Sequence, residues 1–232
     1  MKKGDERRAQ ILETAERIFY EKGYEATSVQ DILDAMNLSK GGFYHHFESK
    51  IALLTEICEL RSDEAIGRAS EAVAECEGAI DKLNALFSKG GLLHGENADF
   101  VGLFLRIAYR GEGVVLRERM KAATVAGASP LMAEIVARGV QEKVFYTRHP
   151  DEIGDILLQL FADLMDGIAY ILATRPDEIA EALSKLEAYR SSVELLLNAP
   201  YGSIELFRID RMAEIGRVSR VEPQRDPAER PQ

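Results

Sequence analysis

The chain has 232 residues, 46% of them hydrophobic, so it can bury a core of one or two domains without disulfides or structural metals. Cys58 and Cys76 form no CxxC pair, and neither a charged-then-apolar leader nor an apolar run of 18 residues occurs, so we expect a cytoplasmic protein without a membrane partner. The net charge of −10 restricts any nucleic-acid site to a small, locally basic region.

Apolar residues recur every three or four positions and strand signals are scarce, which predicts an all-α fold. The first helix should cover residues 5–22 and end at Gly23. A capping box of Thr27 and Gln30 should open a second, short helix, which ends where Asn37 can adopt positive φ. Ser39 should cap a third helix over residues 40–46, and Ser49 a long fourth one.

Breaks between further helices are predicted at Gly and Pro residues. They fall at Gly90-Gly91, Gly111 with Gly113, Ser129-Pro130, His149-Pro150, Arg175-Pro176 and Ala199-Pro200. Segments 151–173 and 177–198 carry wide apolar stripes that need more cover than each other, so we expect a homodimer through these last two long helices. The candidate interface residues are Leu157, Leu160, Phe161, Leu164, Ile168, Leu186, Val193 and Leu197.

Residues 27–50, TSVQDILDAMNLSKGGFYHHFESK, predict two short helices joined by a tight turn. This is a helix-turn-helix, whose second helix enters the major groove of DNA. Phe43 and Phe47 are four residues apart and should point into the core, whereas Lys40 with Tyr44 shares the opposite face. A cation and a phenol on that face suit guanine edges and phosphates.

The string SKGGFYHHF followed by Lys50 resembles the signature of the tetracycline-repressor (TetR) family, with Asn37 where that family commonly has Gly and Leu33 where it commonly has Ala. The resemblance implies that Thr27, Ser28, His46 and Lys50 hold phosphates, and that Gln30, Lys40, Gly41, Tyr44 and His45 approach bases. The candidate DNA-binding set is therefore Thr27, Ser28, Gln30, Ser39, Lys40, Gly41, Gly42, Tyr44, His45, His46 and Lys50.

The resemblance also implies a helix-turn-helix domain over residues 1–48 and a larger helical ligand-binding and dimerisation domain over 49–215. The stretch over 216–232 is rich in Arg, Pro and Glu, which predicts a disordered tail. The partners would be a palindromic DNA operator and an unknown small apolar or amphipathic effector that releases a repressor from it. Candidate effector contacts are Phe100, Phe104, Arg106, Ile107, Tyr109, Met120, Met132 and Phe145.

Other interpretations of these residues are weaker. His45 and His46 project about 100° apart on a helix, so we expect no metal site there, and no cofactor is predicted. His94 and His149 accompany no nucleophile elbow, phosphate loop, HExxH or paired-carboxylate motif, so no enzyme is predicted. The remaining alternative is an all-helical small-molecule carrier or adaptor that has lost operator binding.

Overall fold

The computed structural model describes residues 3–89, 98–109 and 113–206. Within these ranges every regular element is helical. In chain order the elements are α1 (Lys3–Lys22), α2 (Val29–Met36), α3 (Lys40–Tyr44), α4 (Lys50–Ala74), α5 (Ala79–Lys89), α6 (Ala98–Ala108), α7 (Gly113–Gln141), α8 (Pro150–Thr174), the 3-10 helix η1 (Pro176–Glu178) and α9 (Ile179–Leu197).

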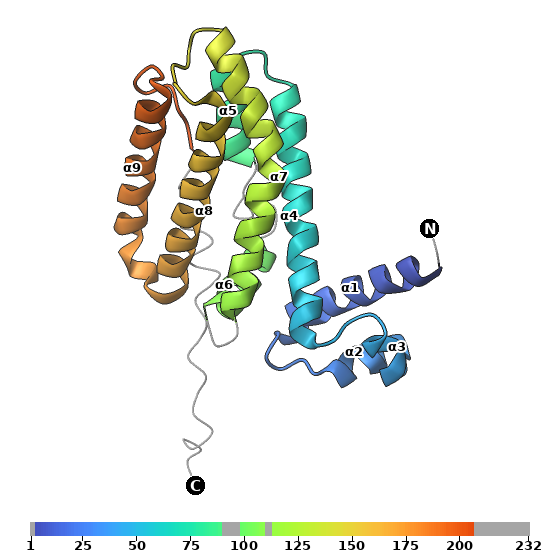
Figure 1. The fold of residues 1–232 in the computed structure, drawn as a ribbon. Helices are drawn as coiled ribbons and strands as arrows, with labels where there is room; N and C mark the ends of the chain where they lie inside the picture. Colours follow the sequence, from blue (N-terminus) through green and yellow to red (C-terminus); the bar gives the residue numbers. More distant parts are fainter. Residues whose placement is uncertain (1–2, 90–97, 110–112, 207–232) are drawn as a thin grey trace.

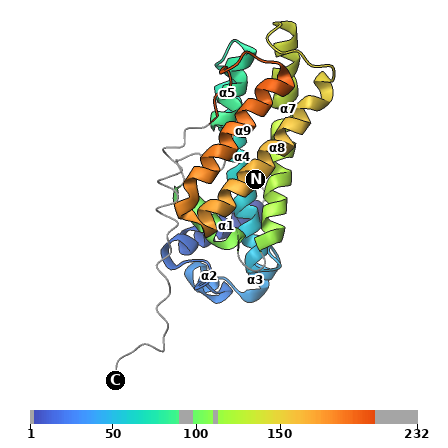
Figure 2. The ribbon, with the colours of Figure 1, turned by 90° about the vertical axis from the view of Figure 1, so that its left-hand side faces the viewer.

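The helices form a small N-terminal unit and a larger bundle. Helices α1, α2 and α3 gather at the lower end of α4 in Figure 1, while α4, α7, α8 and α9 run side by side above them, with α5 at the far end. Figure 2 shows α8 and α9 together on the side of the bundle that faces away from α1. The predicted all-α fold, a three-helix unit followed by a larger helical domain, is confirmed.

The start of α2 differs from the predicted capping box. Ser28, not Thr27, is the N-cap: its hydroxyl accepts from the Asp31 amide, and the Asp31 carboxylate accepts from the Ser28 amide. Thr27 is buried and its hydroxyl donates to the Gly23 carbonyl at 2.7 Å. A Ser followed three residues later by Asp carries the same signal, shifted by one position.

The turn between α2 and α3 has the predicted backbone geometry. Asn37 adopts φ 49°, ψ 47°, and its N–H donates to the carbonyls that close α2. The Ser39 hydroxyl accepts from the Gly42 amide at 3.1 Å and caps α3. Helix α3 ends at Tyr44, two residues earlier than predicted, so His45 and His46 lie in the following turn.

Helix α4 is shared by the two units. Its first half buries Leu53, Leu54 and Ile57 in one apolar cluster with α1, α2 and α3, and this cluster also contains Ile107 of α6 and Met120 of α7. Its second half packs on α5 and α7 in a separate cluster. A movement of α6 or of the start of α7 would therefore change the packing of the N-terminal unit directly.

The break predicted at Ser129-Pro130 is wrong, because α7 continues through both residues to Gln141. A proline inside a helix removes one backbone hydrogen bond and crowds the preceding turn. Here the segment after Pro130 buries Met132, Ile135 and Val136 in the bundle core, against α5 and α8. This packing outweighs the free-energy cost of a proline within the helix. Sequence spacing does not predict the packing, because it involves residues of other helices.

Helix α8 is apolar over most of its circumference. By length and composition alone it is the one helix in the described ranges that could cross a membrane, yet 44% of that apolar stretch is buried inside the bundle. It packs on α7 along one side and α9 along another. Its apolar character therefore fits a central helix whose outer side still carries exposed hydrophobic groups.

Some sequence predictions lie outside the described residues. These are the breaks at Gly90-Gly91 and Gly111, His94, and the tail over residues 216–232.

Candidate nucleic-acid interface

The short helix α3 buries one side and exposes the other. Phe43 and Phe47 are buried, with ring centroids 5.9 Å apart, and hold α3 against the core. Tyr44 is 54% exposed, and its ring meets Phe43 edge-on at 5.3 Å, which fixes its direction. Lys40, Gly41 and His45 are exposed on the same side as Tyr44. We call Lys40, Gly41, Tyr44 and His45 the exposed face of α3.

This face is open and carries an available cation. The Lys40 ammonium has neither a hydrogen bond nor an ion pair among the residues that the structure describes. A Cβ placed on Gly41 would have no atom within 4 Å, whereas one on Gly42 would lie 2.8 Å from the Leu38 Cδ1. Gly41 therefore leaves room for an external surface, and Gly42 makes room for a neighbouring side chain.

Two residues expected to hold phosphates have partners inside the chain. Lys50 donates from Nζ to the carbonyls of Tyr24 and Thr27, both at 2.8 Å, and its ammonium lies 4.1 Å from the Tyr24 ring centroid. Burial lowers the pKa of Lys50, against the opposing effect of Glu25 and Asp31. Lys50 thus connects the start of α4 to the α1–α2 loop. The Thr27 hydroxyl also has a partner inside the chain, the Gly23 carbonyl.

Ser28 keeps an exposed position at the start of α2, although its hydroxyl is engaged with Asp31. Lys22 of α1 donates to the same carboxylate at 2.7 Å. The hydrogen bonds from Lys22 and Ser28 hold the pKa of Asp31 well below its usual range. The negative charge of the carboxylate that caps α2 is therefore offset by the Lys22 ammonium, which reduces its repulsion of a nearby phosphate.

Arg8 makes contacts that the sequence pattern does not predict. Its guanidinium donates from Nε to Glu56 at 2.7 Å and from NH1 to the His46 carbonyl at 2.8 Å, and it lies 4.5 Å from the Phe47 ring centroid. One arginine of α1 thereby contacts α4 and the turn that follows α3. Nothing in the local spacing distinguishes this arginine from Arg7, which bonds only to Gln10 in its own helix.

The predicted effector contacts that the structure describes belong to different apolar clusters. Ile107 and Met120 belong to the cluster beside the N-terminal unit, and Met132 and Phe145 to the cluster at the far end of the bundle. Tyr109 donates to Asp166 at 2.8 Å and packs with α8, while Phe104 and Arg106 are half-buried on α6. The side chain of Phe100 lies outside the described set. Helical spacing had indicated that these residues face inward but not which cluster each one joins.

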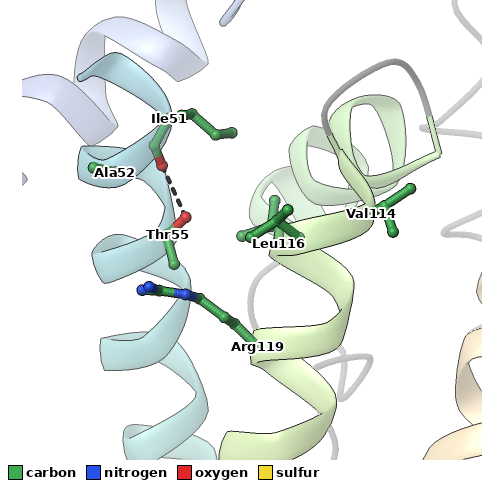
Figure 3. A pocket seen from close by; sticks show the side chains of 7 residues that line it. Ile51, Ala52, Thr55, Val114, Leu116 and Arg119 are labelled. Carbon is green, nitrogen blue, oxygen red and sulfur yellow. Dashed lines mark hydrogen bonds between the residues drawn. The ribbon is translucent and has the colours of Figure 1, made fainter. Parts of the chain in front are cut away.

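A surface pocket of about 380 Å³ lies between the first turns of α4 and α7 (Figure 3). Its lining is mostly aliphatic, with Arg119 at one side, and Thr55 donates to the Ile51 carbonyl along its α4 wall. A second pocket, of about 340 Å³, lies between α1 and α4 and is rich in carboxylates. The predicted effector contacts line neither of these pockets.

The candidate interface residues of α8 and α9 divide into two groups. Most of them are buried in the core of the single chain and offer a partner no surface: Leu157, Phe161, Ile168, Leu186, Val193 and Leu197. Leu164 is half-buried, and Leu160 is 42% exposed. The prediction is corrected for the buried six, because the apolar stripe of each helix includes its core-facing side. The exposed large apolar residues of these two helices are Ile156, Leu160 and Tyr170 on α8 and Leu195 and Leu196 on α9.

The arrangement of α1 to α3 defines a helix-turn-helix DNA-binding fold: a capped helix, a tight turn through Asn37, and a second helix with its exposed face outward. Residues 11–57 match the family described as bacterial regulatory proteins, tetR family. Over this domain the chain is similar to the TetR family, as its signature had indicated.

Curated relatives share this region. The transcriptional repressor KstR2 of Rhodococcus jostii is 41% identical over 68 residues, which are 29% of this chain and 33% of the relative. The transcriptional regulator TtgR of Pseudomonas putida is 35% identical over 82 residues, 34% of this chain and 39% of the relative. The matched stretch thus spans well under half of either relative. Both relatives are named as regulators of transcription, not as enzymes.

Solved structures extend the likeness to the whole fold. A TetR-family regulator from Pectobacterium atrosepticum aligns with a TM-score of 0.58 at 21% identity, covering 85% of this chain and 97% of the other. One from Cytophaga hutchinsonii aligns with a TM-score of 0.53 at 21% identity, covering 86% and 97%. The larger helical domain is therefore of the same architecture as in these regulators.

Proposed function

We propose that this protein is a homodimeric, sequence-specific DNA-binding regulator of transcription, a repressor that leaves a palindromic operator when a small molecule binds. The observation that carries the proposal is the exposed face of α3, where Lys40 and Tyr44 project from a helix anchored by Phe43 and Phe47. A phenol and an unpaired ammonium on a helix narrow enough for the major groove suit base edges and phosphates. Operator binding in turn implies a cytoplasmic protein.

The alternative, a helical carrier without operator binding, is less favoured. A carrier would need the bundle but would have no use for an outward-facing α3. Here α3 is held by Arg8 and the start of α4 by Lys50, and both contacts would be superfluous in a vestigial unit. The similarity to repressors over residues that include this unit adds support.

The dimer would form through the outer sides of α8 and α9. Ile156, Leu160, Leu195 and Leu196 are exposed there, and Leu195 is 81% exposed. Ile156 and Leu160 lie in the first half of α8, and Leu195 and Leu196 in the last turn of α9. The start of α8 and the end of α9 lie away from α1 to α3 (Figure 1). Two copies joined by this surface would present two α3 helices on one side, as a palindromic site requires. We propose a second copy of the chain as the partner, because a twofold contact would cover the same four residues on both copies.

The effector would act by population shift. A small apolar or amphipathic molecule that binds better when the two α3 helices are wrongly spaced would lower operator affinity in proportion to that preference. The cluster shared by α4, α6 and α7 provides mechanical contact between the bundle and the N-terminal unit.

The test is selection of genomic fragments by the full-length protein, followed by mobility shift and footprinting at physiological salt. We expect a near-palindrome whose half-sites lie about one helical turn or more apart. Retardation of no fragment would favour the carrier, and footprints lacking dyad symmetry would contradict the dimer. Small molecules that release the bound fragment would then identify the effector class.

A further inference from the structure

Gln30 lies exposed on the first turn of α2, one turn before Asp34 on the same face of that helix. The Gln30 amide donates from Nε2 to the Asp34 Oδ1 at 2.7 Å. The proposed function places the N-terminal end of α2 next to the operator, since the Ser28 cap and the exposed face of α3 belong to the same helix-turn-helix. The Gln30 side chain is therefore presented to DNA with its amide nitrogen bonded to Asp34.

The identity of the partner decides which end of the amide points outward. An ionised carboxylate only accepts hydrogen bonds, so Asp34 must engage the NH₂ end of Gln30. The carbonyl oxygen of Gln30 is then the end that points away from Asp34, and the NH₂ group keeps one further hydrogen. Because the bond is charge-assisted, it is stronger than a bond between two neutral groups, and reversal of the amide would sacrifice it.

In the major groove each base presents its own pattern of donors and acceptors. Adenine N6 and cytosine N4 are donors, whereas guanine O6 and N7 and thymine O4 are acceptors. A free glutamine can serve either kind, and it pairs with adenine by using both ends of its amide. A glutamine whose NH₂ end is held by Asp34 presents its carbonyl oxygen to a base amine and keeps one N–H that can donate, so it favours adenine or cytosine over guanine or thymine.

We propose, on the basis of the proposed function, that Asp34 is a specificity-determining residue: it orients Gln30 so that this side chain selects adenine or cytosine at one position of each half-site. Asp34 need not touch DNA for this role. Its charge also opposes phosphate binding at every sequence, so it raises selectivity while lowering total affinity. Gln30 is the contacting residue, and Asp34 positions it.

The experiment compares base preferences in vitro, by sequencing half-site libraries bound by the wild-type dimer and by Gln30→Ala, Asp34→Asn and the double variant. Asparagine keeps the size of the side chain but can donate, so it permits the Gln30 amide to reverse. We expect one position where the wild type prefers adenine or cytosine by about fivefold to tenfold, where Gln30→Ala has no preference, and where Asp34→Asn falls below about twofold or prefers guanine or thymine. The double variant should match Gln30→Ala.

Glu48→Gln is the matched control, because it removes one exposed negative charge from the same domain without touching Gln30. It should raise affinity for all sequences alike and leave the preference unchanged. The inference is overturned if Asp34→Asn keeps the wild-type preference at the position that Gln30→Ala loses, or if Gln30→Ala changes no position. A wild-type protein that enriches no sequence would instead overturn the proposed function, with the inference that rests on it.

Discussion

Tyr44 and Lys50 are both part of the family signature, but they have different surroundings. The hydroxyl of Tyr44 has no partner among the described residues and its ring is half exposed, whereas the ammonium of Lys50 is bonded to two carbonyls of the α1–α2 loop. One side chain is therefore available for contact and the other supports the backbone. Substitutions should separate these two roles.

Tyr44→Ala should lower operator affinity at least about tenfold, because it removes an exposed ring and hydroxyl from the centre of the proposed contact. Stability should change by less than about 0.5 kcal/mol, since the residue is on the surface. Mobility-shift titration and thermal denaturation measure the two effects. Operator binding at wild-type strength would show that this face does not contact DNA.

Lys50→Met should instead destabilise the protein, by about 1–3 kcal/mol, because the carbonyls of Tyr24 and Thr27 lose a charged donor in a half-buried setting. Operator affinity should fall as a consequence. Urea denaturation gives the loss directly. If Lys50→Met bound DNA weakly but unfolded like the wild type, direct phosphate binding by Lys50 would be the better explanation.

Gly41→Ala should raise stability and lower operator affinity together. Alanine is preferred to glycine within a helix by roughly 1 kcal/mol, and its Cβ meets nothing within 4 Å in the free protein. The added methyl group would occupy the space where a base or phosphate approaches. Gly42→Ala is the control, since its Cβ would crowd Leu38, so that variant should gain no stability. An unaltered operator affinity for Gly41→Ala would place the contact elsewhere on α3.

At the scale of elements, the turn between α2 and α3 depends on one backbone conformation. Asn37 occupies the left-handed region with φ 49°, where glycine is under no strain and a β-branched residue is strongly disfavoured. Asn37→Gly should therefore keep or raise the free energy of unfolding, by up to about 1 kcal/mol, and Asn37→Val should lower it by about 1–2 kcal/mol. Urea denaturation of both variants checks the ranking, and equal stabilities would contradict it.

The elements that sequence predicted well are those whose ends have a local cause. Helices end or begin there through the backbone or side chain of a single residue, so residue type located these ends: Gly23, Asn37, Ser39 and Ser49. Pro130 was misjudged because the packing that keeps α7 continuous involves residues from other helices. The Thr27 and Gln30 capping box was misplaced by one residue, because two adjacent hydroxyl residues offer nearly the same signal.

The candidate site follows the same division. Burial of Phe43 with Phe47, and exposure of Tyr44 on the other face, follow the four-residue spacing of a helix and were predictable. The ties of Arg8 and Lys50 to distant backbone carbonyls were not, because they depend on how α1 and α4 cross. The described effector candidates belong to different clusters for a similar reason: an inward direction on a helix does not specify which of several clusters a side chain joins.

On the scale of the whole molecule, the dimer should depend on the outer side of α8. Leu160→Asp should produce monomers and weaken operator binding, because it places a charge in the exposed apolar surface that a second copy would cover in the proposed dimer. Analytical ultracentrifugation measures the change, with circular dichroism to establish that the helices remain. Val140→Asp, at an exposed apolar position of α7, is the matched control. Unchanged sedimentation of Leu160→Asp would remove this surface from the interface.

Because α4 is one unbroken helix, it can transmit a movement of the bundle to the helix-turn-helix. Its 25 residues extend for about 37 Å, from the bundle clusters at one end to the helix-turn-helix at the other. If α4 tilts rigidly by about 5° about its end in the bundle, its helix-turn-helix end moves by about 3 Å, which is comparable to the rise of one base pair. Small repacking around α5 and α7 would thus be magnified into a mismatch of register on the duplex, with no need for any helix to unfold.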